Sequence, residues 1–580
     1  MYSDRLTKRR IGLALFCVFA VVGLLFSKLI DVQVVRAAEL RQESAQIRTT
    51  SEIIWASRGA IVDGFGNYLA VDVDRYDVSV DPRRAGDFRR DGQVVSLESA
   101  VEEIATITGA SEDILLGRIL ESETPHFSYL VKAVSPEVRA ELRKLRNPWI
   151  QIDLVRQRTY PFGPVVANLT GMLGTDEPLA GIERDRNSCL QATNGVATYQ
   201  RGADGIRLPG TTNQVKKPLH GGDVRLTIDS DLQWYVLQTL AEHGSALRAK
   251  YGSAMVVRVN DGHVMATADW PTFDPNDFSR SPAEFMGARA FSSPYEPGSI
   301  MKPVGIAMLI DRGYTFAADR IIAPGQYRVH SGGFIKNFSE MGDVQLTTAG
   351  VLHTSSNTGI SVLSNRMPKE EASAYFRNFG FGEVTAINFL GESAGRVLTA
   401  DEVDVMSRYN QFFGQGISVT AAQMASAYQT LANNGVKVPL RLVDGCSVKE
   451  GDFLAEVKGE TSRVVGDSAA QQTIRMMETI VEEGPLREIL RIPGYRVAAK
   501  TGTAEIATSE GYGDERVISL AGMAPAENPQ YVVVVSFYKP QASRVSSAAA
   551  PAFQEILSHV LKHYRVPPSS QKADLPPLTW

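Results

Sequence analysis

The sequence predicts an α+β protein with one N-terminal transmembrane helix, an elongated region of mixed strands and helices, and a larger domain built on an antiparallel sheet. Three observations lead to this prediction. An apolar run follows a basic N-terminus, strand-like segments occur at both ends of the second half, and helix-like segments lie between them. The chain has 580 residues, which is too long for one hydrophobic core.

The composition is that of a globular protein, with 44% hydrophobic and 22% charged residues. A net charge of −5 gives no reason to expect a nucleic acid or another polyanion as a partner. Cys17 lies in the apolar run, and Cys189 and Cys446 are far apart. No Cys-x-x-Cys pair suggests zinc or thioredoxin-like chemistry. A Cys189–Cys446 disulfide is one interpretation, but we favour two buried free thiols.

The N-terminus predicts a membrane anchor. A basic cluster at residues 5–10 precedes an apolar run that extends from Ile11 to Ile30. A helix crosses the hydrocarbon core in about 20 residues, so this run is long enough if Lys28 extends toward the headgroups. A cleaved signal peptide is the alternative, but residues 36–38 form a poor cleavage site. We therefore expect a cytoplasmic tail at 1–10, a span at 11–30, and everything after about residue 32 outside the cell.

Residues 31–225 mix short strands with helices and contain no serine–lysine pair or metal cluster. Helical spacing runs from Leu97 to Thr108 and stops at Gly109, and Ser111 is placed to cap a second short helix. Ser135-Pro136 opens a third helix, since proline is favoured at the first helical position. The region is predicted to be a spacer or docking module.

The second domain is expected at 226–566, after a boundary near Gly221-Gly222. A capped strand ends at Asp229, and an Asn-Asp-Gly turn at 260–262 predicts a hairpin. The expected elements are a helix at 232–242, hairpin strands at 252–259 and 264–268, strands at 517–523 and 531–538, and a helix at 552–563. The proline-rich segment 567–580 is predicted to be disordered.

Three short strings carry the chemistry: Ser299-Ile300-Met301-Lys302, Ser355-Ser356-Asn357 and Lys500-Thr501-Gly502. A serine hydroxyl is a poor nucleophile without a nearby base, and residues three apart at a helix start share one face. A lysine that acts as the base must be neutral, which burial near another cation promotes. Each string alone would more often be a cap, a turn or a solvated lysine, but the ordered set favours an active-site serine enzyme.

The ordered strings resemble the penicillin-binding protein and β-lactamase superfamily. Further strings are similar to class B penicillin-binding proteins over about residues 10–565; they are Arg58–Asp63, Gly181-Ile182-Glu183, Tyr295-Glu296-Pro297-Gly298 and Gly414–Thr420. The resemblance implies a non-catalytic pedestal at 31–225. It also implies a penicillin-binding transpeptidase domain at 226–566, in which helices flank the sheet and form an all-helical subdomain.

The same resemblance implies a role for each site residue. Ser299 would be the nucleophile, Lys302 its base, and Ser355 a proton relay. Asn357 would bind the substrate amide, and Lys500 would supply positive charge beside the serine. Thr501, Gly502 and Thr503 would bind substrate, with Gly502 allowing close backbone approach. The backbone N–H groups of Ser299 and Thr503 would form the oxyanion hole. Neither a metal nor an organic cofactor is implied.

The implied activity is peptidoglycan D,D-transpeptidation through an acyl-Ser299 intermediate, with β-lactams acylating the same serine. The string at 497–503 and the strands at 516–539 look most like those of division-specific septal enzymes. Such enzymes are single-pass proteins of the bacterial cell membrane that work with a polytopic SEDS-family glycosyltransferase and other divisome proteins. An elongation-specific transpeptidase is the nearest alternative.

A β-lactamase, a β-lactam sensor and a non-catalytic scaffold are weaker alternatives. No Glu-x-x-Leu-Asn string lies between Ser355 and Lys500, where class A lactamases carry their deacylating base. Two departures from the class B pattern, Ala499 and the loop at 484–487, are expected to change the rim of the cleft and leave the catalytic groups in place. His559 and His563 are four apart on a helix without a third ligand nearby, so we expect a surface position rather than a metal site.

Overall fold

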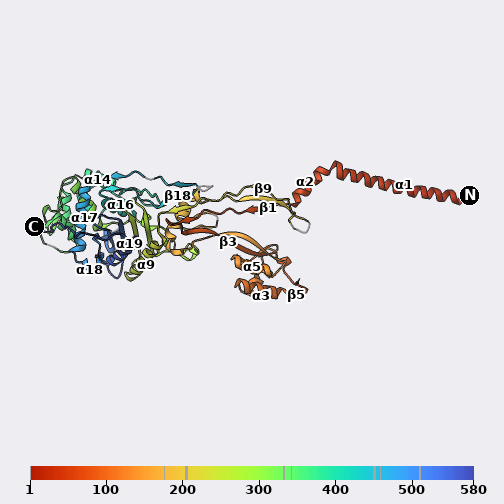
Figure 1. The fold of residues 1–580 in the computed structure, drawn as a ribbon, viewed down its shortest axis with the longest axis horizontal. Helices are drawn as coiled ribbons and strands as arrows, with labels where there is room; N and C mark the ends of the chain where they lie inside the picture. Colours follow the sequence, from red (N-terminus) through yellow and green to blue (C-terminus); the bar gives the residue numbers. More distant parts are fainter. Residues whose placement is uncertain are drawn as a thin grey trace. The chain divides into compact units, whose positions relative to one another are not determined.

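The structure is a computed structural model that describes residues 2–175, 177–202, 207–330, 333–340, 342–447, 452–457, 459–508 and 511–580 (Figure 1). The chain forms two compact units. One comprises Met1–Ser57 and Ala192–Gly221, and the other comprises Arg58–Gln191 and Gly222–Trp580. The expected catalytic residues all lie in the second unit.

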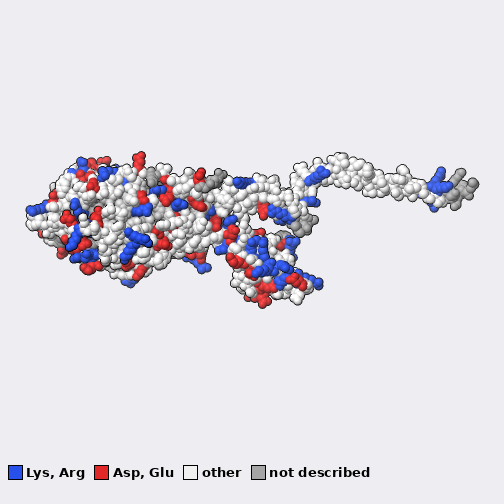
Figure 2. Space-filling view, viewed as in Figure 1, with Lys and Arg blue, Asp and Glu red and all other residues white. Residues whose placement is uncertain are grey.

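The first unit contains the candidate membrane span. Helix α1 (Tyr2–Ile30) continues through a π-helical segment (Asp31–Val35), and α2 (Ala37–Arg48) follows. Within Leu6–Val35 an 18-residue window has a mean hydropathy of 2.5, and the helix is long and apolar enough to cross a bilayer. Figure 2 shows few charged side chains along most of α1. The rest of the unit is a small antiparallel sheet, β1 (Thr49–Ile54), β8 (Gly195–Gln200) and β9 (Asn213–Lys216).

The second unit begins with a lobe of helices packed on long strands. Its strands are β2 (Ile61–Val62), β3 (Tyr68–Val80), β4 (Phe88–Arg90), β5 (Gln93–Val95), β6 (Ser128–Val134) and β7 (Ile150–Thr159). Its helices are α3 (Leu97–Thr108), α4 (Glu112–Leu120) and α5 (Pro136–Lys144), as predicted. Ser135 caps α5 through the N–H of Val138, whereas Ser111 precedes α4 without a side-chain cap. Side chains of both charge signs gather on this lobe (Figure 2).

Residues of two strings that resemble the class B pattern, Arg58 and Glu183, meet in a buried ionic cluster. The Glu183 carboxylate accepts from Arg58 Nε at 2.7 Å and from Arg158 Nε at 2.6 Å. Strand β3 pairs with β7 so that Asp72 lies opposite Arg158, and their side chains form an ion pair at 3.2 Å. Glu183, on the short helix α7 (Gly181–Asp185), is completely buried. The cluster therefore fixes α7 to the start of the lobe.

The catalytic half is built on a five-stranded antiparallel sheet, as predicted. The strand order is β12 (Val264–Trp270), β11 (Tyr251–Arg258), β23 (Tyr531–Tyr538), β22 (Gly511–Ala524) and β21 (Ala498–Thr508). Alternate residues of a strand face opposite sides of a sheet. Val533 and Val535 therefore pack with α9 (Ser230–Ala246) and α19 (Ala550–His563), whereas Val532 and Val534 pack with α16 (Ala421–Ala432) and α17 (Asp467–Glu482).

A mostly helical part is inserted between β12 and β21. Its helices include α11 (Lys302–Asp311), α12 (Thr348–His353), α13 (Asn357–Ser364) and α14 (Lys369–Asn378). Three two-stranded sheets accompany them: β13 (Arg320–Ala323) with β16 (Val344–Thr347), β14 (Gln326–Arg328) with β15 (Phe334–Lys336), and β17 (Val436–Lys437) with β20 (Ser462–Arg463). A further sheet extends β2, β3, β6 and β7 with β10 (Val224–Leu226), β18 (Val443–Ser447) and β19 (Phe453–Ala455).

The preference for free thiols was wrong, because Cys189 and Cys446 form a disulfide. Cys189 lies on α8 (Asn187–Leu190) and Cys446 on β18. Strand β10 pairs with β18 so that Val224 lies opposite Cys446, and the N–H of Gly222 donates to Cys189 O at 2.9 Å. Tertiary pairing thus joins two cysteines separated by 257 residues, which their spacing in the sequence does not reveal.

The prediction of disorder for 567–580 was also wrong. Leu578 packs against the main core, and the Trp580 indole N–H donates to Leu346 O at 3.1 Å. Thr579 forms a β-bridge with Leu346. The prolines prevent this segment from forming a helix or a regular ladder, but they leave its carbonyl groups and apolar side chains free to dock.

Candidate active site

Ser299 lies at the start of a helix that is packed against the sheet. A 3₁₀ turn (Gly298–Met301) leads into α11, with Pro303 in the first turn of that helix. Gly298 has φ 59°, and a Cβ there would lie 2.6 Å from Thr503 O. The Gly298 N–H donates to Gly414 O at 3.0 Å. Glycine is therefore required before Ser299, because β21 and the 414–420 string both approach the Gly298 backbone.

Lys302 is at the centre of the predicted site residues. Its Nζ atom lies 3.1 Å from Ser299 Oγ, 3.2 Å from Ser355 Oγ and 2.8 Å from Asn357 Oδ1. It also donates to the backbone carbonyl of Ser355. The first two strings of the sequence thus converge on one amine, with the nucleophile within hydrogen-bond reach of its expected base.

Both lysines of the site are buried, and burial disfavours their charged forms. Lys302 is 0% exposed, and desolvation together with the charge of Lys500 holds the Lys302 pKa well below its ordinary value. Lys500 is 1% exposed, and desolvation lowers its pKa to about 7. A neutral lysine beside Ser299 can accept the hydroxyl proton, so this environment favours the form of Lys302 that its expected role requires.

Ser355 occupies a backbone conformation that usually belongs to glycine. Its φ is 55°, and its N–H donates to Leu352 O at 3.2 Å while the Ser356 N–H donates to Val351 O at 3.0 Å. This is the Schellman pattern that ends α12, with Ser355 at the left-handed position. Ser356 then caps α13 by accepting from the Gly359 N–H. The capping role of Ser356 agrees with the simpler interpretation of this string as a helix cap, whereas the sequence did not reveal the strain at Ser355.

The third string lies on the edge strand of the sheet. Strand β21 pairs only with β22 in the described sheet, so its other edge is free to pair with an extended ligand. Lys500 Nζ donates to Thr501 O at 3.0 Å. A Cβ on Gly502 would lie 2.7 Å from Ser519 Oγ and 2.8 Å from Pro297 O, so only glycine fits there.

One cleft of about 880 Å³ contains Ser299, Ser355, Asn357, Thr501 and Thr503. Pro485 and Leu486 also line this cleft. The loop at 484–487, which differs from the class B pattern, therefore forms part of its rim. Two further residues that line the cleft, Lys336 and Asn337, were not predicted from the sequence. They lie beside the second string, since Asn357 Nδ2 donates to Lys336 O at 3.2 Å. An ion pair in the cleft, Glu505 with Arg516 at 3.0 Å, was not predicted either. No motif points to these residues before the fold brings them together.

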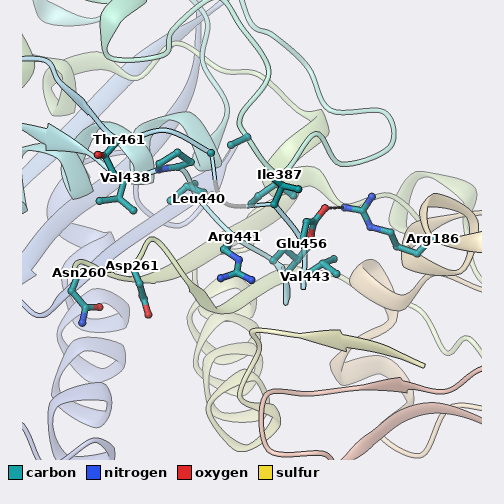
Figure 3. Close-up of a pocket in the computed structure, with 15 residues that line it drawn as sticks. Arg186, Asn260, Asp261, Ile387, Val438, Leu440, Arg441, Val443, Glu456 and Thr461 are labelled. Atoms are coloured by element: carbon teal, nitrogen blue, oxygen red, sulfur yellow. Dashed lines mark hydrogen bonds and ion pairs between the residues drawn. The ribbon is translucent and has the colours of Figure 1, made fainter. Parts of the chain in front are cut away.

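A second cavity of about 250 Å³ lies elsewhere in the same unit (Figure 3). Arg186 and Glu456 form an ion pair at its edge at 2.6 Å, and Arg441 and Asp261 also line it. None of the predicted site residues lines this cavity.

The two histidines of α19 contribute to packing. The His559 ring stacks on Tyr235 at 3.7 Å, and His563 Nε2 lies 2.8 Å from Asp229 Oδ2, the carboxylate that caps α9. In the part of the chain that the structure describes, no group of three or more potential metal-ligating side chains occurs.

Comparisons with known proteins agree with this geometry. The model of the penicillin-binding protein transpeptidase domain matches residues 252–558, and that of the penicillin-binding protein dimerisation domain matches residues 53–178. Penicillin-binding protein PbpB of Mycolicibacterium smegmatis is 33% identical, covering 97% of this chain and 91% of that protein. Peptidoglycan D,D-transpeptidase FtsI of Escherichia coli K12 is 29% identical, covering 97% of this chain and 93% of that protein.

Solved structures are similar over the same extent. A peptidoglycan synthetase from Bifidobacterium adolescentis has a TM-score of 0.72 and 30% identity, covering 92% of this chain and all of that one. Penicillin-binding protein 3 of Mycobacterium tuberculosis, complexed with aztreonam, has a TM-score of 0.70 and 26% identity over 91% of this chain and all of that one. The fold, the converging site and these matches together show that the chain belongs to the class B penicillin-binding proteins.

Proposed function

We propose that this protein is a peptidoglycan D,D-transpeptidase that cross-links stem peptides through an acyl-Ser299 intermediate. The observation that carries the proposal is the 3.1 Å contact between Ser299 Oγ and the buried amine of Lys302. It is supported by the transpeptidase family match and by relatives that are named peptidoglycan D,D-transpeptidases.

In the proposed acylation, neutral Lys302 takes the proton of Ser299 while the serine oxygen attacks the D-alanyl-D-alanine carbonyl. The oxyanion is bound by the N–H groups of Ser299 and Thr503. The peptide C–N bond then breaks, the leaving D-alanine nitrogen takes a proton through Ser355, and an ester remains on Ser299. Asn357 binds the substrate amide, Lys500 adds positive charge, and Thr501, Gly502 and Thr503 hold the substrate along β21.

In the proposed second step, the amine of a neighbouring stem peptide attacks the acyl-Ser299 ester. The ester C–O bond breaks, the new amide is the cross-link, and the proton of the amine returns the serine to its hydroxyl form. β-Lactams would acylate the same serine and leave slowly. Solved relatives from Mycobacterium tuberculosis complexed with aztreonam and ampicillin support this proposal.

The proposed setting is septal wall synthesis during division. Relatives named FtsI and the candidate span Leu6–Val35 support it. We infer that residues 1–10 form a cytoplasmic tail and that the catalytic domain is extracytoplasmic. We also infer that a SEDS-family glycosyltransferase and other divisome proteins are partners. The basic residues Lys8, Arg9 and Arg10 before the span favour this orientation. We propose the domain limits 1–10, 11–30, 31–225 and 226–566 for tail, span, pedestal and transpeptidase domain. An elongation role is the alternative for the cellular setting.

The test is the intact mass of the full-length protein in detergent, followed over time after benzylpenicillin is added. A stable adduct that is absent from Ser299→Ala is the expected result. An adduct that forms and clears within seconds would indicate a β-lactamase instead. An adduct that persists in Ser299→Ala, or none on the wild-type protein, would overturn the assignment of Ser299.

A further inference from the structure

The segment 569–580, here called the strap, is bound at both of its ends to elements that lead into the active site. At the first end, the Ser569 N–H donates to Gly494 O at 2.8 Å, and Ser569 Oγ accepts from the Arg496 N–H at 2.9 Å. Arg496 lies two residues before β21, the strand that carries Lys500. The first end of the strap therefore lies at the entrance to the third motif.

The other end of the strap is bound to the start of α12. The Thr347 N–H donates to Leu578 O at 3.0 Å, and the Thr347 hydroxyl donates to Pro577 O. Thr347 is the N-cap of α12, and its hydroxyl oxygen also accepts from the Gly350 N–H. The Trp580 indole N–H donates to Leu346 O and Ile321 O, at 3.1 and 3.2 Å. The strap thus supplies a carbonyl acceptor for the N–H of Thr347, one of the donors that the start of a helix leaves unpaired.

Helix α12 connects the strap to Ser355 over a short distance. It spans only Thr348–His353, and the Schellman turn that follows places Ser355 against Lys302. Its fit to the strap is tight, because a Cβ on Gly350 would lie 2.0 Å from Leu578 O. A shift at the start of this helix would therefore move Ser355 and Asn357 together.

We propose that the strap is a positioning element, which holds α12 in place relative to β21 so that Ser355 and Asn357 stay in register with Lys302 and Lys500. The inference rests on the proposed acylation at Ser299. The strap itself touches no reacting atom, and it acts through the backbone of α12.

The middle of the strap contributes little to the fold. Residues 569–573 and Leu575 line a cavity of about 930 Å³ together with the segment around Arg487–Arg496. Without the strap, Arg496 keeps its ion pair with Glu478 at 2.7 Å. The Tyr495 hydroxyl also keeps its hydrogen bond to Val566 O, because Val566 precedes the strap. A chain that ends at Pro568 should therefore fold.

The first experiment compares the full-length protein with a chain that ends at Pro568, using stopped-flow acylation by a fluorescent penicillin. A misplacement near 1 Å can cost about 100-fold in rate, so we expect a 10- to 100-fold lower acylation rate constant with little change in the initial dissociation constant. A synthetic peptide of residues 567–580, added in trans, should restore part of the rate. An unchanged rate constant in the shortened chain would overturn the proposal.

The second experiment displaces the strap without removing it. Gly350→Ala in the full-length protein should lower the acylation rate constant about as far as the shortening does. In the chain ending at Pro568 the same substitution should have a much smaller effect, because the Leu578 backbone is gone and only the flexible Leu346 side chain remains close to the added Cβ, at 3.2 Å. Gly342→Ala is the matched control, since no atom lies within 4 Å of a Cβ there. If Gly350→Ala lowered the acylation rate constant by the same factor in both chains, the substitution would be acting on the helix itself and not through the strap.

A third measurement keeps the inference testable if the wild-type protein is not acylated, a result that would defeat the proposed function alone. Hydrogen exchange of residues 347–356 should be faster in the chain that ends at Pro568, and exchange on β23 should not change. Equal protection of residues 347–356 in both chains would sink the strap proposal whatever the activity.

Discussion

The Oγ atom of Ser299 lies 3.1 Å from the Nζ atom of Lys302, whose side chain is fully buried. Lys302→Ala should therefore reduce acylation by benzylpenicillin about as far as Ser299→Ala does, because the two residues act as a unit. Lys302→Arg should be equally inactive, since a guanidinium stays charged and cannot take the proton. Acylation rates measured by intact mass test this. A Lys302→Arg protein that acylates at the wild-type rate would remove lysine from the role of base.

The acylation rate should rise with pH as Lys302 loses its proton, and fall again above about pH 7 as Lys500 loses the positive charge that the proposed mechanism uses. Only neutral Lys302 can accept the proton of Ser299, and desolvation and the charge of Lys500 lower the Lys302 pKa well below its ordinary value. The acid limb of the rate profile should accordingly lie far below pH 10. Second-order acylation constants between pH 5 and 9 report it, with stability at each pH checked separately. A rate that is highest at pH 5 and falls throughout this range would contradict the proposed base.

Lys500→Met should be more stable than the wild type at pH 7 and inactive. The folded pKa of Lys500 is about 7 and the unfolded value is about 10.4, so between them the unfolded chain binds more protons and stability rises with pH. Burial of this lysine therefore costs about 4 kcal/mol near pH 7. The lost hydrogen bond to Thr501 O offsets about 1 kcal/mol of the gain.

Thermal unfolding at two pH values checks this prediction. The advantage of Lys500→Met should be full below pH 7, remain large at pH 7, where the burial cost in the wild type is still about 4 kcal/mol, and be smaller by a few kcal/mol at pH 9.5, because that cost disappears as the unfolded chain also loses its proton. If the stability difference between Lys500→Met and the wild type grew with pH, it would have the opposite sign to that expected for a lysine whose folded pKa is lowered.

Ser355→Gly should stabilise the protein and abolish most of its acylation. Ser355 has φ 55° at the end of α12, which costs an L-residue about 1–2 kcal/mol and costs glycine nothing. Ser355→Ala is the matched control: it loses the same hydroxyl and keeps the strain, so its activity should fall equally without a gain in stability. Denaturant unfolding compares the stabilities of the two variants, and acylation kinetics compare their activities. Equal stabilities for the two variants would mean that the backbone strain at Ser355 is negligible.

Local patterns in the sequence predicted what local forces determine. The helix 97–108 and the cap at Ser135 depend on neighbouring residues, and both were predicted correctly. The hairpin at 252–268 depends on its Asn-Asp-Gly turn. Long-range partners were predicted poorly. The Cys189–Cys446 disulfide, the docking of 577–580 on Thr347, and the Glu505–Arg516 pair in the cleft each require the sheet order or a tertiary approach that no short window of sequence contains.

The buried carboxylate of Glu183 provides the last prediction. It accepts from Arg58 and Arg158 in a cluster whose Glu183 and Arg158 side chains are 0% and 4% exposed. Breaking a buried ion pair from one side costs about 3–5 kcal/mol, because the remaining charges stay buried without their partner. Glu183→Gln should therefore lower the free energy of unfolding by about 3 kcal/mol, with Asp72 retaining Arg158 in part.

An exposed pair in the same lobe is the control. Asp91 and Arg146 lie 3.3 Å apart with side chains 78% and 74% exposed, so Asp91→Asn should change stability by no more than about 0.5 kcal/mol. Urea unfolding measures both variants. Acylation of folded Glu183→Gln by benzylpenicillin should keep the wild-type rate, because none of the residues that line the Ser299 cleft belongs to the cluster. A Glu183→Gln protein as stable as Asp91→Asn would show that the cluster stabilises the fold no more than a solvent-exposed ion pair does. The presence of Arg58 and Glu183 in two strings that resemble the class B pattern would then need an explanation other than stability.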